Sequence, residues 1–372
     1  MHFSLEFFLT IRYNLISFYV TPYIPYIKGE RVERILCMTI YDISKKAGVS
    51  IATVSRVLNG SSNVSEKTKQ KVLNVIEQCG YTPNAFARGL GLNTMKTIGI
   101  MCADSSDIYL AKAVYYIERK LHANGYDSIL ICSGYELKTK ISSMNLLISK
   151  KVDGIILVGS NFIYEKDADN KYIADAAAQV PVMLLNATLT MPNVYSVLSD
   201  DYSSVYDATT SLIASGRKNI LYFYNSASYS AKKKLSGFTT AMSDHRLLQP
   251  DTQLQYYQGS HEDIHSMVKH LSSLRKNGLS FQGVIASDDT LALAAVKYAR
   301  EWKLRIPQDL SIIGYNNTIL ATCCDPELTS VDNKLETLCQ HLISTLMGVL
   351  SGQEMPKKTV FAGELVRRGT TL

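Results

Sequence analysis

The strongest constraint on the fold is an alternation, from residue 98 onward, of short apolar runs with segments of helical length. Continuously apolar runs are typical of strands buried on both faces of a parallel sheet, and the intervening helices would cover those faces. Because roughly 275 residues exceed one compact core, we expect two α/β lobes. The runs are at 98–102, 127–132, 152–158, 181–185, 219–224, 283–286 and 310–314.

Polar clusters follow several of these runs. Parallel α/β sheets bind ligands beyond the carboxyl ends of their strands, so we expect these clusters to line a ligand site. The clusters are residues 104–107, Asn186, residues 287–289 and residues 315–317.

The positive charge of the chain is local. Residues 38–97 hold eight cations and three anions, a net charge of +5, whereas residues 98–372 hold 27 of each sign. A short basic segment before a neutral body indicates a polyanion-binding module joined to a part that binds another kind of partner.

The basic segment has the pattern of two short helices joined by a tight turn. Thr39 and Asp42 supply the acceptor and the first-turn carboxylate that favour a helix start, and Gly48 suits the turn. Ser50 can cap a second helix over residues 51–58, and Ser65 a third that ends at Gly80. This is helix-turn-helix geometry, and a plain helical bundle with an incidental basic surface is the alternative.

The second helix would present its first turn to DNA. Val54, Val57 and Leu58 face inward at helical spacing, whereas residues 51–53, 55 and 56 include the exposed face. Arg56 can make a bidentate contact to guanine in the major groove.

Three sequence runs closely resemble the lactose-repressor/galactose-repressor (LacI/GalR) family of bacterial transcription regulators. They are TIYDISKKAGVSIATVSRVLNG (39–60), VSEKT (64–68) and GYTPNAFAR (80–88). The resemblance implies that Ile51, Ala52 and Arg56 read bases while Thr53, Ser55 and Asn59 lie near phosphates. The full DNA-binding set that we predict is Thr39, Tyr41, Ser50, Ile51, Ala52, Thr53, Ser55, Arg56, Asn59, Asn84, Ala87, Arg88 and Leu90.

Residues 81–97 resemble the hinge helix and linker of that family. By the resemblance, the segment after Asn84 orders when two subunits lie over the minor groove, and Leu90 wedges into the central base step. The alternative is a flexible linker, which Gly89 and Gly91 favour.

The family resemblance continues through the body to residue 372. It rests on VDGII (152–156), IASD (285–288), PQDLS (307–311), GYN (314–316), LTSV (328–331) and ELVRRG (364–369). It implies a periplasmic-binding-protein-like domain whose lobes close on a small effector. The implied effector-binding residues are Asp104, Tyr109, Leu110, Asn186, Lys234, Ser287, Asp288 and Asn316.

Three positions depart from the sugar-responsive pattern of the family. Lys234 stands where an arginine is common, and Asn186 and Asn316 stand where aspartates are common. A lysine lacks the planar fork of arginine, and an asparagine lacks the charged acceptor, so a simple hexose is less expected than a different or more anionic effector. The alternative for residues 232–234 is a solvent-facing run of charge.

Neither catalytic nor metal-binding spacing is present in the sequence. No glycine-rich phosphate loop follows a strand, and no Ser/His/Asp or Cys/His arrangement is indicated, so we expect neither an enzyme nor a cofactor. The seven scattered cysteines indicate free thiols in a reducing compartment, with adjacent Cys323 and Cys324 as the one redox-sensor candidate.

Residues 1–37 form an N-terminal extension with no clear role. The segment is too short and too broken by Pro22 and Pro25 for a transmembrane helix, and it lacks the pattern of a secretory signal. Met38 directly precedes the first helix start, so we expect translation to begin there; a membrane anchor is the alternative.

The sequence thus predicts a small all-α helix-turn-helix domain (38–80), a hinge helix and linker (81–97) and a two-lobed α/β effector-binding and dimerisation domain (98–372). We expect a cytoplasmic, homodimeric regulator, most simply a repressor, that binds double-stranded operator DNA under the control of a small effector such as a carbohydrate. The alternatives are a DNA-binding regulator that is independent of small ligands or controlled by a protein partner, and a non-regulatory solute-binding protein.

Overall fold

The computed structural model describes residues 38–58, 63–81 and 94–372. The chain divides into two compact units, residues 1–84 and residues 85–372, and each is described by itself. The predicted Asn59, Asn84, Ala87, Arg88 and Leu90 lie outside the described residues, as does the extension 1–37.

The described part of the first unit is a three-helix domain. It consists of α2 (Ile40–Ala47), α3 (Ile51–Leu58) and α4 (Glu66–Gln78). Ile43, Ala47, Val54, Val57 and Val72 bury their side chains in one small core. The predicted helix-turn-helix is confirmed.

The helix boundaries follow from the predicted capping residues. Thr39 and Asp42 form a reciprocal capping box at the start of α2, and Gly48 ends it in the left-handed conformation at φ 60°. The Ser50 hydroxyl accepts from the Thr53 N–H at 3.2 Å at the start of α3, and the Ser65 side chain caps α4. These contacts satisfy N–H groups that a helix start otherwise leaves unpaired.

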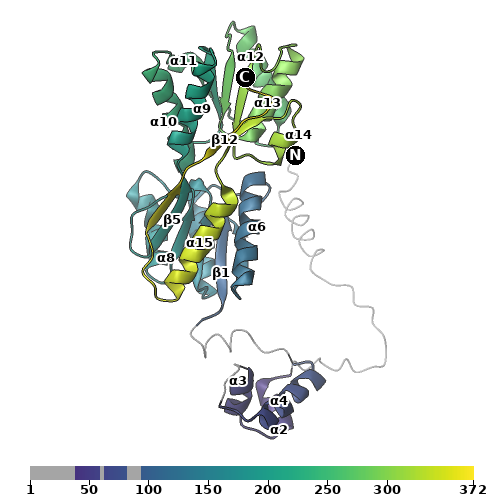
Figure 1. Cartoon of the computed structure of the whole chain (residues 1–372). Coiled ribbons are helices and arrows are strands. Elements are labelled where there is room, and N and C mark those ends of the chain that lie inside the picture. The colour runs from purple at the N-terminus through teal and green to yellow at the C-terminus, as the bar shows by residue number, and fades with distance from the viewer. Residues whose placement is uncertain (1–37, 59–62, 82–93) are drawn as a thin grey trace, which may run out of the picture. The chain divides into compact units, whose positions relative to one another are not determined.

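The second unit has the two α/β lobes that the sequence predicts (Figure 1), and each lobe contains a six-stranded sheet. Their orders are β11-β5-β4-β3-β1-β2 and β12-β10-β9-β8-β6-β7, and every pairing is parallel except that of β12 with β10. Lobe 1 contains β1 (Thr97–Cys102), β2 (Asp127–Cys132), β3 (Gly154–Val158), β4 (Val182–Leu185), β5 (Val194–Ser199) and β11 (Lys358–Phe361). Lobe 2 contains β6 (Ile220–Tyr224), β7 (Leu254–Tyr256), β8 (Gly283–Ala286), β9 (Ser311–Tyr315), β10 (Thr329–Asp332) and β12 (Glu364–Val366).

Helices cover both faces of each sheet, which is why the central strands are apolar throughout. In lobe 1, α6 (Ile108–Ala123) and α15 (Leu335–Leu350) pack on one face, and α7 (Leu137–Ser149) and α8 (Lys171–Ala177) pack on the other. In lobe 2, α9 (Asp201–Ala214) and α10 (Tyr229–Asp244) pack opposite α12 (Ile264–Lys276) and α13 (Asp289–Glu301). The short elements are the 3₁₀ helices η1 (Ser160–Phe162) and η2 (Asp167–Asn170), with α11 (Pro250–Gln253) and α14 (Ile319–Cys323).

The chain crosses between the lobes three times. The crossings lie between β5 and α9, between β10 and α15, and between β11 and β12, so each lobe is assembled from separate segments of the chain.

All seven predicted strands are present; two have the predicted ends and five are shifted by one or two residues. The predicted run 152–158 begins as a strand only at Gly154, and the Asp153 carboxylate just before it accepts hydrogen bonds from the N–H groups of Met95 and Thr97. The strands β5, β7, β10, β11 and β12 were not predicted.

Candidate functional site

The α3 helix presents part of its first turn to solvent. Ile51 is 38% exposed, and Ala52 and Arg56 are exposed with it, whereas Val54 and Val57 are buried. Exposed apolar side chains beside a guanidinium suit contact with thymine methyl groups and guanine edges in the major groove.

The other described DNA-binding candidates lie at helix starts or on exposed helix faces. Tyr41 is 64% exposed on α2. The Ser50 and Thr53 hydroxyls are 2.9 Å apart, and the Thr39 hydroxyl donates to Asp42 at 2.7 Å, so these groups are already oriented by capping contacts. Ser55 is partly buried on α3.

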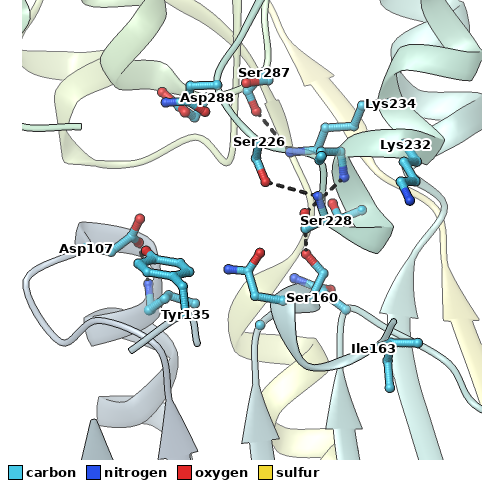
Figure 2. Close-up of a pocket in the computed structure, with 18 of the residues that line it drawn as sticks. Asp107, Tyr135, Ser160, Ile163, Ser226, Ser228, Lys232, Lys234, Ser287 and Asp288 are labelled. Atoms are coloured by element: carbon cyan, nitrogen blue, oxygen red, sulfur yellow. Dashed lines mark hydrogen bonds between the residues drawn. The ribbon is translucent and has the colours of Figure 1, made fainter. Parts of the chain in front are cut away.

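A cavity of about 710 Å³ lies between the two lobes of the second unit (Figure 2). Seven of the eight predicted effector residues line it: Tyr109, Leu110, Asn186, Lys234, Ser287, Asp288 and Asn316. Asp104 is not among the lining residues, because its carboxylate turns back to accept from the N–H and hydroxyl of Ser106. Asp107 lines the cavity at that strand end instead.

Amide side chains surround the hydroxyl of Tyr109 at the crossing between the lobes. The Asn333 amide donates to this hydroxyl at 2.9 Å and to Asn316 Oδ1 at 3.2 Å, and the Asn186 amide also donates to the hydroxyl. Asn186 Oδ1 and Asn333 Oδ1 are both buried without a hydrogen-bond partner. Leaving such acceptors unpaired costs free energy, so a ligand hydroxyl would be a favourable partner.

Lys234 is a buried cation of lobe 2, only 7% exposed. Its ammonium donates to the Ser287 carbonyl at 2.9 Å and lies 3.6 Å from the centre of the Tyr315 ring. Burial lowers the pKa of Lys234, and the nearby carboxylates of Asp201 and Asp288 oppose that effect. The adjacent Lys232 and Lys233 are exposed, so the solvent-facing alternative applies to them but not to Lys234.

Two polar contacts join the lobes at the cavity. The Ser160 hydroxyl donates to that of Ser228 at 2.9 Å (Figure 2). Lys232 of α10 forms an ion pair with Glu165. Because each contact has one partner in each lobe, both depend on how closely the lobes approach.

Several lining residues were missed by sequence reasoning. Lys140, Asn161, Tyr164, His261 and Asn333 all reach the cavity. Asp107 also reaches it, and it belongs to the polar cluster 104–107 that was expected to line a ligand site. Lys140 lies inside an ordinary helix and Asn333 in a loop between lobes, so nothing in their neighbouring residues marks them.

The described residues contain no group of His, Cys, Asp and Glu side chains arranged to hold a metal ion. Among the helices that the structure describes, none is both long and apolar enough to cross a membrane.

Comparison with known proteins decides the family. Residues 39–84 match the model described as bacterial regulatory proteins, lacI family, and residues 209–371 match a periplasmic binding protein-like domain. An HTH-type transcriptional regulator of Lachnoclostridium phytofermentans is 55% identical over 334 residues, which span 90% of this chain and 99% of that protein. The chain belongs to the LacI family. It is a helix-turn-helix transcriptional regulator, as the sequence resemblance indicates.

Further relatives of this LacI-family chain agree with that assignment. Catabolite control protein A of Priestia megaterium is 35% identical over 79% of this chain and 87% of its own length. The structure titled lac repressor dimer bound to operator and the anti-inducer ONPF has a TM-score of 0.79 at 24% identity, and the match spans 90% of this chain and 99% of that one. At this identity the structural likeness establishes the fold, which is as predicted.

Proposed function

We propose that this LacI-family regulator is a cytoplasmic homodimeric repressor whose affinity for operator DNA is set by a small effector in the interlobe cavity. The observation that carries the proposal is the cavity itself. It has the volume of a small-molecule site, seven predicted residues line it, and unpaired amide oxygens are buried at its wall.

Similar proteins support both halves of the proposal. One solved structure of the same fold is a lac repressor dimer bound to operator and an anti-inducer, and another is a complex of the transcriptional regulator CelR with cellobiose. We extend DNA binding by a dimer and ligand binding by the lobes from those proteins to this chain.

Effector binding changes DNA affinity only if the effector binds one arrangement of the lobes more tightly than the other. The residues that contact the ligand would come from both lobes, so its binding free energy depends on their relative position. A difference of ~1 to 3 kcal/mol between the two arrangements is the usual range for such coupling.

Dimerisation would use exposed apolar side chains of lobe 1. Ile108 and Tyr115 on α6 are 44% and 46% exposed, and Leu130 on the edge strand β2 is 45% exposed. Exposed apolar groups of this kind favour burial against a second copy. A dimer would bring two recognition helices to two half-sites related by a dyad.

The test is an operator titration with and without effector. DNA sites recovered by in vitro selection are titrated by fluorescence anisotropy, and a metabolite panel is then screened by thermal shift. We expect selected sites to be palindromic and a ligand that raises the melting temperature to change operator affinity. A stabilising ligand without any effect on DNA affinity would contradict effector control and favour a regulator independent of that ligand.

A further inference from the structure

Within the part of the chain that the structure describes, one buried cation in the cavity has no carboxylate partner. Lys140 on α7 lines the cavity although only 1% of its surface is exposed. Among the described residues, its ammonium donates to two neutral oxygens, the Asn161 carbonyl at 2.6 Å and the Tyr164 hydroxyl at 2.8 Å. These two acceptors leave one of its three N–H groups for another partner.

The electrostatic setting of Lys140 differs from that of Lys234. Lys234 has the carboxylates of Asp201 and Asp288 nearby, whereas the one carboxylate that raises the pKa of Lys140 is that of the exposed Glu136. Burial lowers the pKa of Lys140 to about 8, so the side chain remains mainly charged at neutral pH. A buried charge without a counter-ion is costly, and an anion bound there would offset that cost.

The other carboxylates on the cavity wall do not supply that counter-ion. Glu165 pairs with Lys232 across the lobes, and the carboxylates of Asp107 and Asp288 each accept an N–H at a helix start. Asp169 lies near the Tyr164 hydroxyl but makes no ion pair with Lys140.

A second requirement comes from the amide oxygens Asn186 Oδ1 and Asn333 Oδ1. They are buried and unpaired, and they need hydrogen-bond donors such as ligand hydroxyls. The aromatic rings of Phe162 and Tyr164 lie 5.4 Å and 4.8 Å from the Lys140 ammonium and restrict what can reach it from that side.

We propose that the effector is an anionic polyol, in which a carboxylate or phosphate binds the Lys140 ammonium while hydroxyl groups donate to Asn186 and Asn333. The inference rests on the proposed function for the cavity as an effector site. It names the chemical class of the ligand: sugar acids and sugar phosphates share this chemistry, whereas neutral hexoses lack the anion.

The experiment compares ligands matched in carbon skeleton on the full-length protein. Thermal shift and calorimetry are run with glucose, glucuronate and glucose 6-phosphate, and with galactose and galacturonate. We expect an anionic member to raise the melting temperature more than its neutral counterpart, and its affinity to fall as sodium chloride is added. Comparing glucuronate with glucose 6-phosphate shows whether the site prefers a carboxylate or a phosphate.

Substitutions on α7 test whether Lys140 is the cation that binds the anion. Lys140→Gln should lower the affinity for the anionic ligand by about tenfold or more, which is the usual cost of losing a charge-assisted hydrogen bond. Its affinity for neutral sugars should stay unchanged. Lys138→Gln is the matched control, because Lys138 is exposed on the same helix and does not line the cavity. Lys140→Arg keeps the charge and should keep the preference for anions, and it replaces Lys140→Gln if that variant fails to fold.

The opposite results would overturn the inference. Neutral members that bind as tightly as the anionic ones, anionic members that all fail to bind, or an unchanged affinity in Lys140→Gln would each contradict it. Operator titration separates this outcome from failure of the proposed function. An anion that binds through Lys140 without changing DNA affinity refutes effector control alone, and a neutral sugar that changes DNA affinity refutes the anionic class alone.

Discussion

At the scale of single residues, Arg56 is the exposed cation on α3, the helix expected to read DNA bases. We predict that Arg56→Ala lowers the discrimination between a selected operator and a scrambled site by about 1 to 3 kcal/mol, because a bidentate contact to guanine depends on the base. Fluorescence anisotropy on the two DNAs measures the difference. In the control Lys67→Ala, removal of an exposed charge should weaken binding to both sites equally. An equal loss on both sites in Arg56→Ala would contradict base reading.

Asp289 provides a residue-scale prediction about pH. Its carboxylate accepts from the hydroxyls of Thr318 and Ser330, at 2.8 Å and 2.6 Å, yet burial outweighs these contacts and raises its pKa to about 6. The folded state therefore holds this proton more tightly than the unfolded state. The resulting stabilisation is fully present below about pH 4 and is lost as pH rises through about 6, a change on the order of 3 kcal/mol.

Urea unfolding of wild type and Asp289→Asn between pH 4 and pH 7 tests this prediction. The difference in unfolding free energy between the two proteins should change by about 2 kcal/mol in favour of wild type on going from pH 7 to pH 4. A difference that stays constant across this range would show that Asp289 has the same pKa in the folded and unfolded states.

Site residues could be predicted from the sequence where a polar side chain directly follows a strand. Asn186, Ser287 and Asp288 directly follow buried strands, and all three line the cavity. Lys140 does not follow a strand; it becomes part of the site only because α7 packs beside the η1 segment. That is a tertiary relation with no local sequence pattern.

At the scale of elements, α9 and α10 pack closely because Gly237 of α10 has no side chain at the point where the two helices approach. A Cβ on Gly237 would lie 2.3 Å from the carbonyl oxygen of Tyr202 on α9. We predict that Gly237→Ala lowers the free energy of unfolding by about 2 kcal/mol or more, since the backbone of α9 would have to move. Chemical denaturation measures it. The neighbouring exposed Ser236→Ala should stay within about 0.5 kcal/mol, and equal effects would contradict a steric cause.

Strands could be predicted from the sequence where their residues form a continuous apolar run. The central strands β1, β3 and β8 are buried along their length and were predicted. The edge strands β7, β11 and β12 are short and partly exposed, so their side chains show no continuous apolar run. Their pairing depends on distant segments of the chain, which local patterns do not reveal.

At the scale of the whole second unit, the Lys232–Glu165 ion pair favours the approach of the two lobes in this structure. Exposed ion pairs contribute at most about 1 kcal/mol. We therefore predict that Lys232→Met lowers the affinity for the effector found in the metabolite panel by up to about fivefold. Calorimetry measures the affinity. Lys233→Met is the control, because Lys233 is exposed and does not line the cavity. Equal weakening by both variants would contradict a role for the interlobe pair.

The third crossing between lobes has a consequence for synthesis of the protein. Near the C-terminus, β11 pairs with β5 in lobe 1 and β12 pairs with β10 in lobe 2, and α15 completes the lobe 1 core. While the ribosome is still adding these segments, both sheets retain an open edge, and one face of the lobe 1 sheet lacks α15. Lobe 1 can therefore finish folding only after β11 has been synthesised, and lobe 2 only after β12. Chains that stop before β11 would expose both edges and become substrates for chaperones and proteases.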